Sequence, residues 1–244
     1  MKNVLHAEVK KLSGSPMAYW LAGAGVLLPA AIAAIVILTR PESALTGAGD
    51  QESILDIARL STLFAFVLGA VAVAGEFRHG TIAQSFLGVP RRMRLVVGKA
   101  VVHGALGLGL GLAATALITG LGWVNLDLAG VDFVPTGSDL LQLFGGLALG
   151  GLLWGLLGVG LGALATNQVA VIAGGLVWIG LVEGLAVALL PEAGKFLPGR
   201  AATALIGVSG ELMLSPAVGG AVLAGWATAF LVAGLRALRL RDIA

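Results

Sequence analysis

Long uncharged stretches dominate the pattern of hydrophobic and polar positions along the chain. One stretch covers the 43 residues between Asp139 and Glu183, and the polar cluster at 166–168 lies near its middle. A helix needs about 20 apolar residues to cross a hydrocarbon core of about 30 Å, so this stretch has room for two spans joined by a tight turn. The complete pattern predicts six membrane-spanning helices, at residues 18–38, 56–75, 97–122, 139–164, 168–190 and 216–235.

Two further apolar patterns are too short to span a membrane. Residues 3–13 place Leu5, Val9 and Leu12 at helical spacing with charged residues opposite, which predicts an N-terminal helix lying along the membrane interface. Residues 201–210 form a run of ten uncharged, mostly apolar residues, which predicts a re-entrant or interfacial helix before the sixth span. The fold class expected is an all-α integral membrane protein, with one transmembrane domain over residues 1–244.

Composition strengthens this interpretation and removes several function classes. The chain is 58% hydrophobic and only 11% charged, with a mean hydropathy of +0.99 and 38 glycines, which is far from the composition of soluble domains. A formal net charge of +2 gives no reason to expect nucleic-acid binding. The absence of cysteine excludes disulfides and thiolate metal sites.

Glycine also recurs at four-residue spacing inside the predicted spans. Pairs such as Gly107 with Gly111 and Gly151 with Gly155 allow two helix backbones to approach closely within lipid. We expect this spacing to serve packing inside one subunit more than contact with a second subunit.

Charge is distributed unequally between the two sides of the six-span arrangement. Eleven of the fifteen Lys and Arg residues fall on the side that holds both termini and the segment 75–99, whereas most acidic residues fall on the other side. Positive residues favour the cytoplasmic side of a membrane. The sequence therefore predicts a multi-pass protein of the cell membrane with both termini in the cytoplasm.

Catalytic and metal-binding motifs are not recognisable in the sequence. No G-x-x-x-x-G-K-[ST] loop is present, and Gly207-Val208-Ser209-Gly210 does not complete a G-x-S-x-G nucleophile elbow. No spacing of His and carboxylate residues indicates a metal site. We expect the chain to have no catalytic residues, no metal and no cofactor of its own.

Polar residues within the predicted spans are candidates for function because they are costly in lipid. Glu183 and Gln142 are the candidates for a translocation path. For Glu183, a structural role as a hydrogen-bonded carboxyl near the outer surface is equally compatible with the sequence. His103 lies one helical turn beyond Lys99, which favours an interface histidine over a proton relay.

The segment from Gly75 to Lys99 is the most polar and basic part of the chain. A carboxylate, Glu76, ends the second span, and Gly80-Thr81 then starts a short apolar helix. Pro90 and a cluster of arginines follow this helix. This order predicts a short helix on the membrane surface with a defined beginning and end.

This segment resembles the ABC type-2 permeases, the membrane subunits of ATP-binding-cassette exporters. The resemblance rests on Glu76-Phe77-Arg78-His79-Gly80-Thr81, Leu87, Pro90-Arg91 and Gly98-Lys99. It implies that residues 80–89 form a cytoplasmic coupling helix between spans 2 and 3, which docks on the ATPase subunit. The residues that it assigns to coupling are Glu76, Arg78, His79, Gly80, Thr81, Phe86, Leu87, Pro90, Arg91 and Arg92.

The same resemblance implies the partners and the activity. The chain would be a half-transporter that needs an ABC ATPase subunit, with ATP and Mg bound on that subunit, and a second permease subunit in a homodimer or a related heterodimer. It would not be an enzyme by itself. The expected activity is ATP-driven export of a hydrophobic or amphipathic drug, lipid or peptide. Two alternatives remain open, a proton-coupled secondary transporter that uses Glu183 and His103, and a membrane scaffold that transports nothing.

Overall fold

The structure is a computed structural model that describes residues 1–89, 91–208, 210 and 212–241. This part of the chain is all-helical, with 85% helix and no strands. Six helical segments are long and apolar enough to cross a membrane, which is the number that the sequence predicts. They are α2 (Pro16–Thr39), α3 to α4 (Ala48–Arg78), α6 (Arg92–Leu128), α7 (Gly137–Ala165), α8 to α9 (Gln168–Leu189) and α12 (Pro216–Leu240).

Two of these segments contain subdivisions, and shorter elements connect the six. The second segment joins α3 (Ala48–Leu55), the 3₁₀ turn η2 (Asp56–Arg59) and α4 (Leu60–Arg78), and the fifth joins α8 (Gln168–Val177), the π-helical turn η3 (Trp178–Val182) and α9 (Glu183–Leu189). The shorter elements are α1 (Lys2–Ser13), η1 (Glu42–Ala44), α5 (Ile82–Gly88), α10 (Pro191–Gly194) and α11 (Pro198–Leu205).

The predicted spans match these helices, with the largest difference at the start of the second. Helical structure begins at Ala48, where the sequence pattern predicts a start at residue 56. Gln51 explains the difference, because its buried amide donates to the carbonyl oxygens of Leu45 and Asp132, at 2.9 Å each, and accepts from the Val134 amide at 2.9 Å. These bonds fix about two extra helical turns against the connection between α6 and α7.

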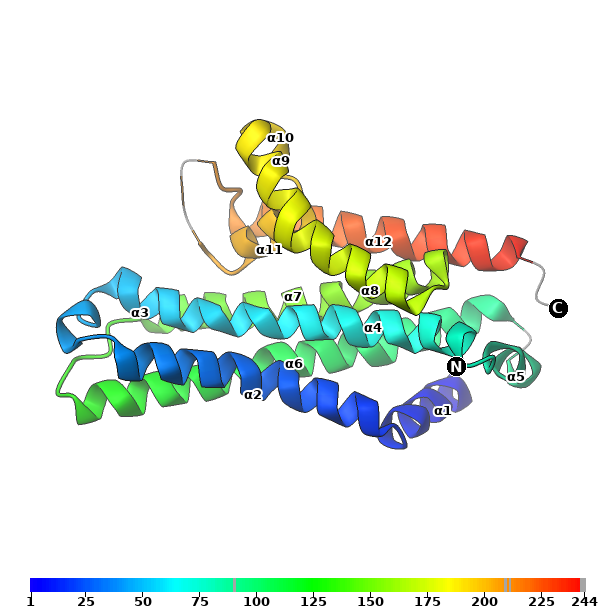
Figure 1. The fold of residues 1–244 in the computed structure, drawn as a ribbon, viewed down its shortest axis with the longest axis horizontal. Helices are drawn as coiled ribbons and strands as arrows, with labels where there is room; N and C mark the ends of the chain where they lie inside the picture. The colour runs from blue at the N-terminus through cyan, green and yellow to red at the C-terminus, as the bar shows by residue number, and fades with distance from the viewer. Residues whose placement is uncertain (90, 209, 211, 242–244) are drawn as a thin grey trace.

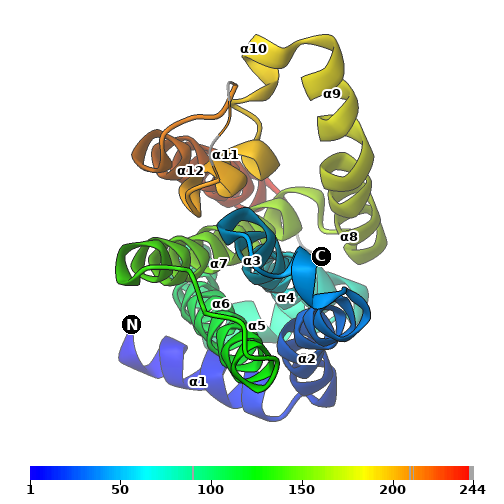
Figure 2. The same cartoon turned by 90° about the vertical axis from the view of Figure 1, so that its left-hand side faces the viewer.

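Helices α4, α6 and α7 form the centre of the bundle, with α2 on one side and α12 on the other (Figures 1 and 2). Helices α6 and α7 meet backbone to backbone at Gly107 and Gly151. A Cβ placed on either glycine would lie 2.1 Å from the carbonyl oxygen of the other, so neither position tolerates a side chain without movement. The expectation that these glycines serve packing within one chain is confirmed for this pair.

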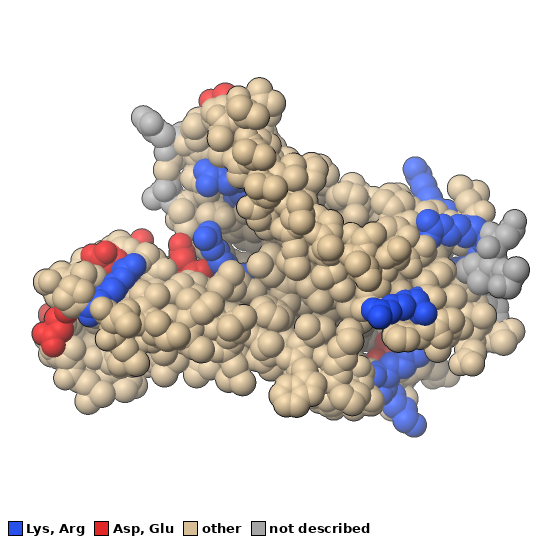
Figure 3. All heavy atoms as spheres, in the orientation of Figure 1, with Lys and Arg blue, Asp and Glu red and all other residues tan. Residues whose placement is uncertain are grey.

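Basic and acidic residues gather at opposite ends of the bundle. The N-terminus, α5 and the last turn of α12 lie together at one end, which we call the basic end (right in Figure 1). On the face shown in Figure 3, most Lys and Arg side chains lie at this end and most Asp and Glu side chains at the opposite end. The arrangement agrees with the charge asymmetry of the sequence.

The segment from α8 to α9 rises away from the bundle, and α10 and α11 lead the chain back to α12 (Figure 1). Helix α11 lies in the region where the sequence predicts a short helix before the sixth span, and it starts at Pro198, three residues earlier than expected. Ser209, near the end of the predicted helix, lies outside the described residues. Whether α11 re-enters a membrane stays a prediction.

Candidate functional site

The chain turns sharply between α4 and α5 at the basic end. Helix α4 continues to Arg78, and the His79 amide donates to the Gly75 carbonyl at 3.0 Å. Gly80 then adopts φ = 67°, a left-handed conformation that residues with a Cβ rarely adopt. The Thr81 amide donates back to the Glu76 carbonyl at 2.9 Å, which closes the turn. Glycine at this position therefore sets the direction in which α5 leaves the bundle.

Helix α5 is shorter than the predicted helix 80–89. It covers Ile82–Gly88, since Gly80 lies in the turn, Thr81 is the N-cap residue and Val89 is the C-cap residue. Ile82 is buried, whereas Leu87 on the outer side is 84% exposed. Helix α5 therefore has one side fixed to the bundle and another side open to a partner.

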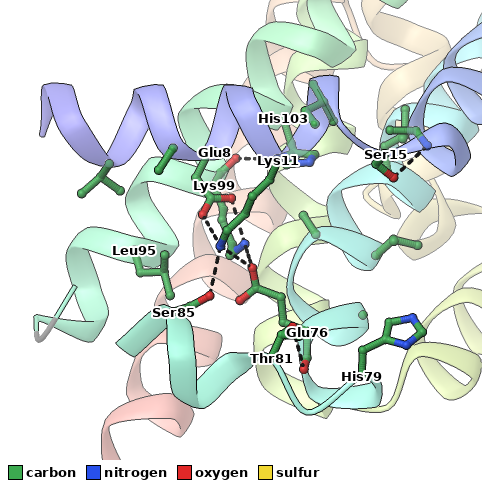
Figure 4. A pocket seen from close by; sticks show the side chains of 18 of the residues that line it. Glu8, Lys11, Ser15, Glu76, His79, Thr81, Ser85, Leu95, Lys99 and His103 are labelled. Carbon is green, nitrogen blue, oxygen red and sulfur yellow. Dashed lines mark hydrogen bonds and ion pairs between the residues drawn. The ribbon is translucent and has the colours of Figure 1, made fainter. Parts of the chain in front are cut away.

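Two glutamates and two lysines from three helices form a compact ion-pair network beneath α5. Lys99 Nζ of α6 donates to Glu8 Oε2 of α1 at 2.8 Å and to Glu76 Oε1 of α4 at 2.7 Å. Lys11 Nζ of α1 donates to Glu8 at 3.1 Å and to Glu76 at 2.8 Å, and also to Ser85 Oγ of α5 at 3.0 Å. Figure 4 shows these side chains converging between α1, α4, α5 and α6. We call Glu8, Lys11, Glu76 and Lys99 the ion-pair network.

Most of this network is removed from solvent. The side chains of Lys99 and Glu8 are 2% and 3% exposed and that of Glu76 is 12% exposed, whereas Lys11 at the edge is 46% exposed. Breaking a buried ion pair by removal of one partner costs about 3–5 kcal/mol, because the remaining charge stays buried without compensation. The two positive and two negative charges therefore depend on one another, and together they hold α1, α4 and α6 in one arrangement.

Lys11 remains protonated despite its partial burial. Burial lowers the pKa of its ammonium group, but hydrogen bonds and charge from Glu76 and Glu8 outweigh this effect and raise the pKa above 10.5 overall. On the side of the network that faces the bundle, Lys99 is followed one turn later on α6 by His103. The Nδ1 atom of His103 lies 3.0 Å from the carbonyl oxygen of Lys99. The histidine thus continues the polar cluster by one helical turn.

A cavity of about 800 Å³ adjoins the ion-pair network. Its lining comes from α1, the start of α2, the second half of α4, α5 and the start of α6, with Gln168 from α8. One part of the lining is polar and includes the ion-pair network, His79 and Ser85, and another part is apolar and includes Leu21 and Leu68. The volume lies within the range of small-molecule sites.

Comparison with known proteins assigns no family to the chain. No protein-family model matches the chain, and no curated protein matches it. Within the described residues, no group of three or more His, Asp or Glu side chains is placed to hold a metal ion. The arrangement offers two chemical properties, a buried group of compensating charges and an amphipathic cavity beside it.

The other residues that the sequence assigns to coupling lie around this region and differ in their exposure. Arg78 and His79 are exposed at the end of α4, and Arg91 is exposed at the start of α6. Arg92 instead lies over the Phe86 ring, 5.1 Å from its centroid, and donates from Nη1 to the carbonyl oxygens of the C-terminal end of α12, Leu238 at 2.8 Å and Arg241 at 2.7 Å. Pro90 lies outside the described residues.

Glu183 and Gln142 lie away from this region, and both bind the backbone of α11. The Gly199 amide, in the first turn of α11, donates to Glu183 Oε2 at 2.8 Å and Oε1 at 3.0 Å. Gln142 Nε2 donates to the Leu205 carbonyl, the last residue of α11, at 2.7 Å. The two side chains therefore bind opposite ends of α11, and neither lines the 800 Å³ cavity.

Sequence reasoning missed Glu8, Lys11 and Ser85 as site residues and named Lys99 only within a motif. One signal was available, since Glu8 and Glu76 are two of the three carboxylates on the strongly basic side of the chain. A carboxylate surrounded by basic residues favours an ion pair with one of them. The sequence does not reveal which cations those carboxylates meet, because the partners are as many as 91 residues apart.

Proposed function

We propose that this chain is the permease subunit of an ABC exporter and that α5 is the helix through which a separate ATPase subunit acts on it. The observation that carries the proposal is the position of α5, a short helix beyond the end of the bundle with an open outer side and several contacts on its inner side. Leu87 and Gln84 are exposed on α5. A docking helix needs both an accessible face and a connection to the elements that it moves.

The inner contacts of α5 lead to most of the bundle. Ser85 contacts Lys11 and through it the ion-pair network of α1, α4 and α6. Phe86 contacts Arg92, which holds the end of α12. A displacement of α5 would therefore reach four other helices through polar contacts. These connections support a mechanism in which ATP binding closes the ATPase subunits, moves α5 and changes the path between the permeases, and in which hydrolysis resets it.

The proposed topology follows from the charge distribution. The basic end, with α5 and the N-terminus, would face the cytoplasm, in agreement with the positive-inside rule. An ATPase subunit in the cytoplasm would meet α5 there, and ATP and Mg would bind on that subunit. The protein would reside in the cell membrane.

A second permease subunit would complete the path. The segment from α8 to α9 contacts the rest of the chain little and exposes large apolar side chains, including Val177, Leu181 and Leu185. Lipid or a second subunit would cover them. A hydrophobic or amphipathic substrate, such as a drug, lipid or peptide, agrees with the apolar spans.

Affinity purification from native membranes tests this function. We expect an ATPase with Walker motifs to co-purify with the chain, and we expect Leu87→Asp to remove it, because a charge on the exposed side of α5 would disrupt an apolar contact. Leu128→Asp is the matched control, since Leu128 is 81% exposed at the other end of α6. It should retain the ATPase.

Two results would contradict the proposal. One is that Leu87→Asp still co-purifies with the ATPase and shows normal substrate-stimulated turnover. The other is substrate transport by the purified chain alone in liposomes under a proton gradient, which would favour the secondary transporter.

A further inference from the structure

The cavity beside the ion-pair network is polar at one end and apolar at the other. Glu76, Lys11 and Ser85 line the polar end (Figure 4), and Leu21 and Leu68 are part of the apolar lining. Leu68 precedes Glu76 by eight residues on α4, which corresponds to about 12 Å along the helix at 1.5 Å per residue. The cavity therefore extends from charged groups at the basic end into the apolar part of the bundle.

Two buried acceptor atoms beside this cavity lack a partner. Glu76 Oε2 and Gln168 Oε1 are buried and accept no hydrogen bond from any described residue. Both residues line the cavity. A Cβ placed on Gly75 would lie 3.8 Å from Gln168 Oε1, so the amide oxygen lies beside the residue that precedes Glu76. A buried carboxylate oxygen without a donor is costly, which indicates that something else supplies the donor.

Neither lysine of the network bonds to Glu76 Oε2, although Lys99 uses two of its three N–H donors, on Glu8 and on the other oxygen of Glu76. An ammonium group has three N–H donors, and Lys11 uses all three on Glu8, Glu76 and Ser85. Lys99 donates to the other oxygen of Glu76, Oε1. The missing partner is thus a hydrogen-bond donor, which is the property of a cationic or hydroxyl group and not of an anion.

We propose that this cavity binds a lipid whose headgroup carries a primary ammonium. The Glu76 and Gln168 side chains, whose unpaired acceptor atoms are buried in the chain without lipid, turn toward the cavity and accept from the ammonium, and part of an acyl chain lies against the apolar residues of α2 and α4. The ion-pair network has equal numbers of positive and negative charges, so it does not repel a zwitterionic headgroup. The apolar lining favours a lipid over a small soluble amine. This binding needs no ATPase, so it goes beyond the proposed function and is tested on the chain alone.

Phosphatidylethanolamine and phosphatidylcholine with identical acyl chains give a direct test. The two headgroups differ by three N-methyl groups, which remove every N–H donor. The purified chain is exchanged into vesicles with equal amounts of both lipids and extracted gently, and the retained lipid is measured by native mass spectrometry. We expect wild-type chain to retain phosphatidylethanolamine roughly tenfold over phosphatidylcholine, the ratio for one charge-assisted hydrogen bond.

Variants assign the preference to the cavity. Glu76→Gln and Gln168→Leu should each bring the ratio toward one. Gln168→Leu keeps all four ion pairs of the network, so it tests the site even when Glu76→Gln does not fold. Glu192→Gln is the control, because this carboxylate is 77% exposed and remote from the cavity, and it should keep the wild-type ratio.

Three results would overturn the proposal. Equal retention of the two lipids by the wild type would show that N–H donors are not recognised. In a second exchange with vesicles that also contain the anionic lipid phosphatidylglycerol, preferential retention of that lipid would show that the site selects negative charge. In the third result, free ethanolamine displaces the bound lipid as readily as phosphatidylethanolamine vesicles do. That result would show that the apolar lining does not contribute to binding.

Discussion

Removal of the Lys99 ammonium is the most direct test of the ion-pair network. Lys99→Met keeps the length and the apolar stem of the side chain, and it leaves two buried carboxylates with Lys11 as their remaining partner in the network. The Lys99 side chain is 2% exposed and that of Glu8 is 3% exposed, so the pair is buried. The free energy of unfolding should therefore decrease by about 3–5 kcal/mol, the range for a broken buried ion pair. For a chain of this size that corresponds to a decrease in Tm of roughly 6–20 °C.

The chain contains a matched control for this variant. Lys195 forms an ion pair with Glu192 at 2.5 Å, and the Glu192 side chain is 77% exposed. Exposed pairs contribute about 0–1 kcal/mol, so Lys195→Met should change Tm by less than about 4 °C. Thermal unfolding of both variants in the same detergent, followed by light scattering and tryptophan fluorescence, measures the difference.

A double variant separates loss of charge balance from loss of packing. Lys99→Met combined with Glu8→Gln removes one charge of each sign, and it should unfold at a higher temperature than Lys99→Met alone. Equal Tm values for Lys99→Met and Lys195→Met would refute the argument that buried charge compensation holds α1, α4 and α6 together. A double variant less stable than Lys99→Met would refute it as well.

Further predictions concern Lys11, the turn before α5 and the end of α12. The pKa of Lys11 is raised on folding, so its contribution to stability is present below pH 10.5, where its carboxylate partners are ionised, and is lost as pH rises through the folded pKa. The difference in Tm between wild type and Lys11→Met should therefore stay constant from neutral pH to about pH 10 and vanish above the folded pKa. Gly80→Ala should destabilise by about 1 kcal/mol in denaturant unfolding, because φ is 67° and the added Cβ meets no atom within 4 Å, so backbone strain is the only cost. Gly88→Ala, which also meets no atom within 4 Å but has no positive φ, should not destabilise. Arg92→Gln should increase hydrogen exchange in the last turn of α12 and leave α7 unchanged, since its guanidinium donates to two carbonyl oxygens at that end.

The sequence predicts the helices well because length and hydrophobicity decide whether a segment can span a membrane. The polar cluster at 166–168 is confirmed as a tight turn, with Thr166 in a left-handed conformation and Asn167 as the N-cap residue of α8. The start of the second helix could not be predicted in the same way. Asp50 and Glu52 lie on the exposed side of α3, and a charge on an exposed side does not end a helix.

The candidate site is predicted in part. The segment around Glu76 is singled out by its polarity in an apolar chain, but the ion-pair network depends on how α1 and α6 approach it. A hydrophobic pattern shows that a helix has a polar position and does not show which helix faces that position. Glu183 and Gln142 illustrate the same limit, since their positions inside predicted spans mark them from the sequence, and only the fold shows that they hold the two ends of α11.

The contacts of α5 differ in strength, which determines how a displacement would pass into the bundle. The contact from Ser85 to Lys11 is one partly exposed hydrogen bond to a charged group, worth about 1.5–3 kcal/mol at most, whereas Lys99 lies in pairs whose disruption costs about 3–5 kcal/mol. The Ser85 contact should therefore break before the ion-pair network does. The other side-chain contact of α5, from Phe86 to Arg92, is a cation–π contact worth about 0.5–1 kcal/mol at an exposed site, so it is weaker still. A pull on α5 should thus break both side-chain contacts while the ion-pair network keeps α1, α4 and α6 together, so the displacement would pass through the covalent connections of α5 to α4 and α6.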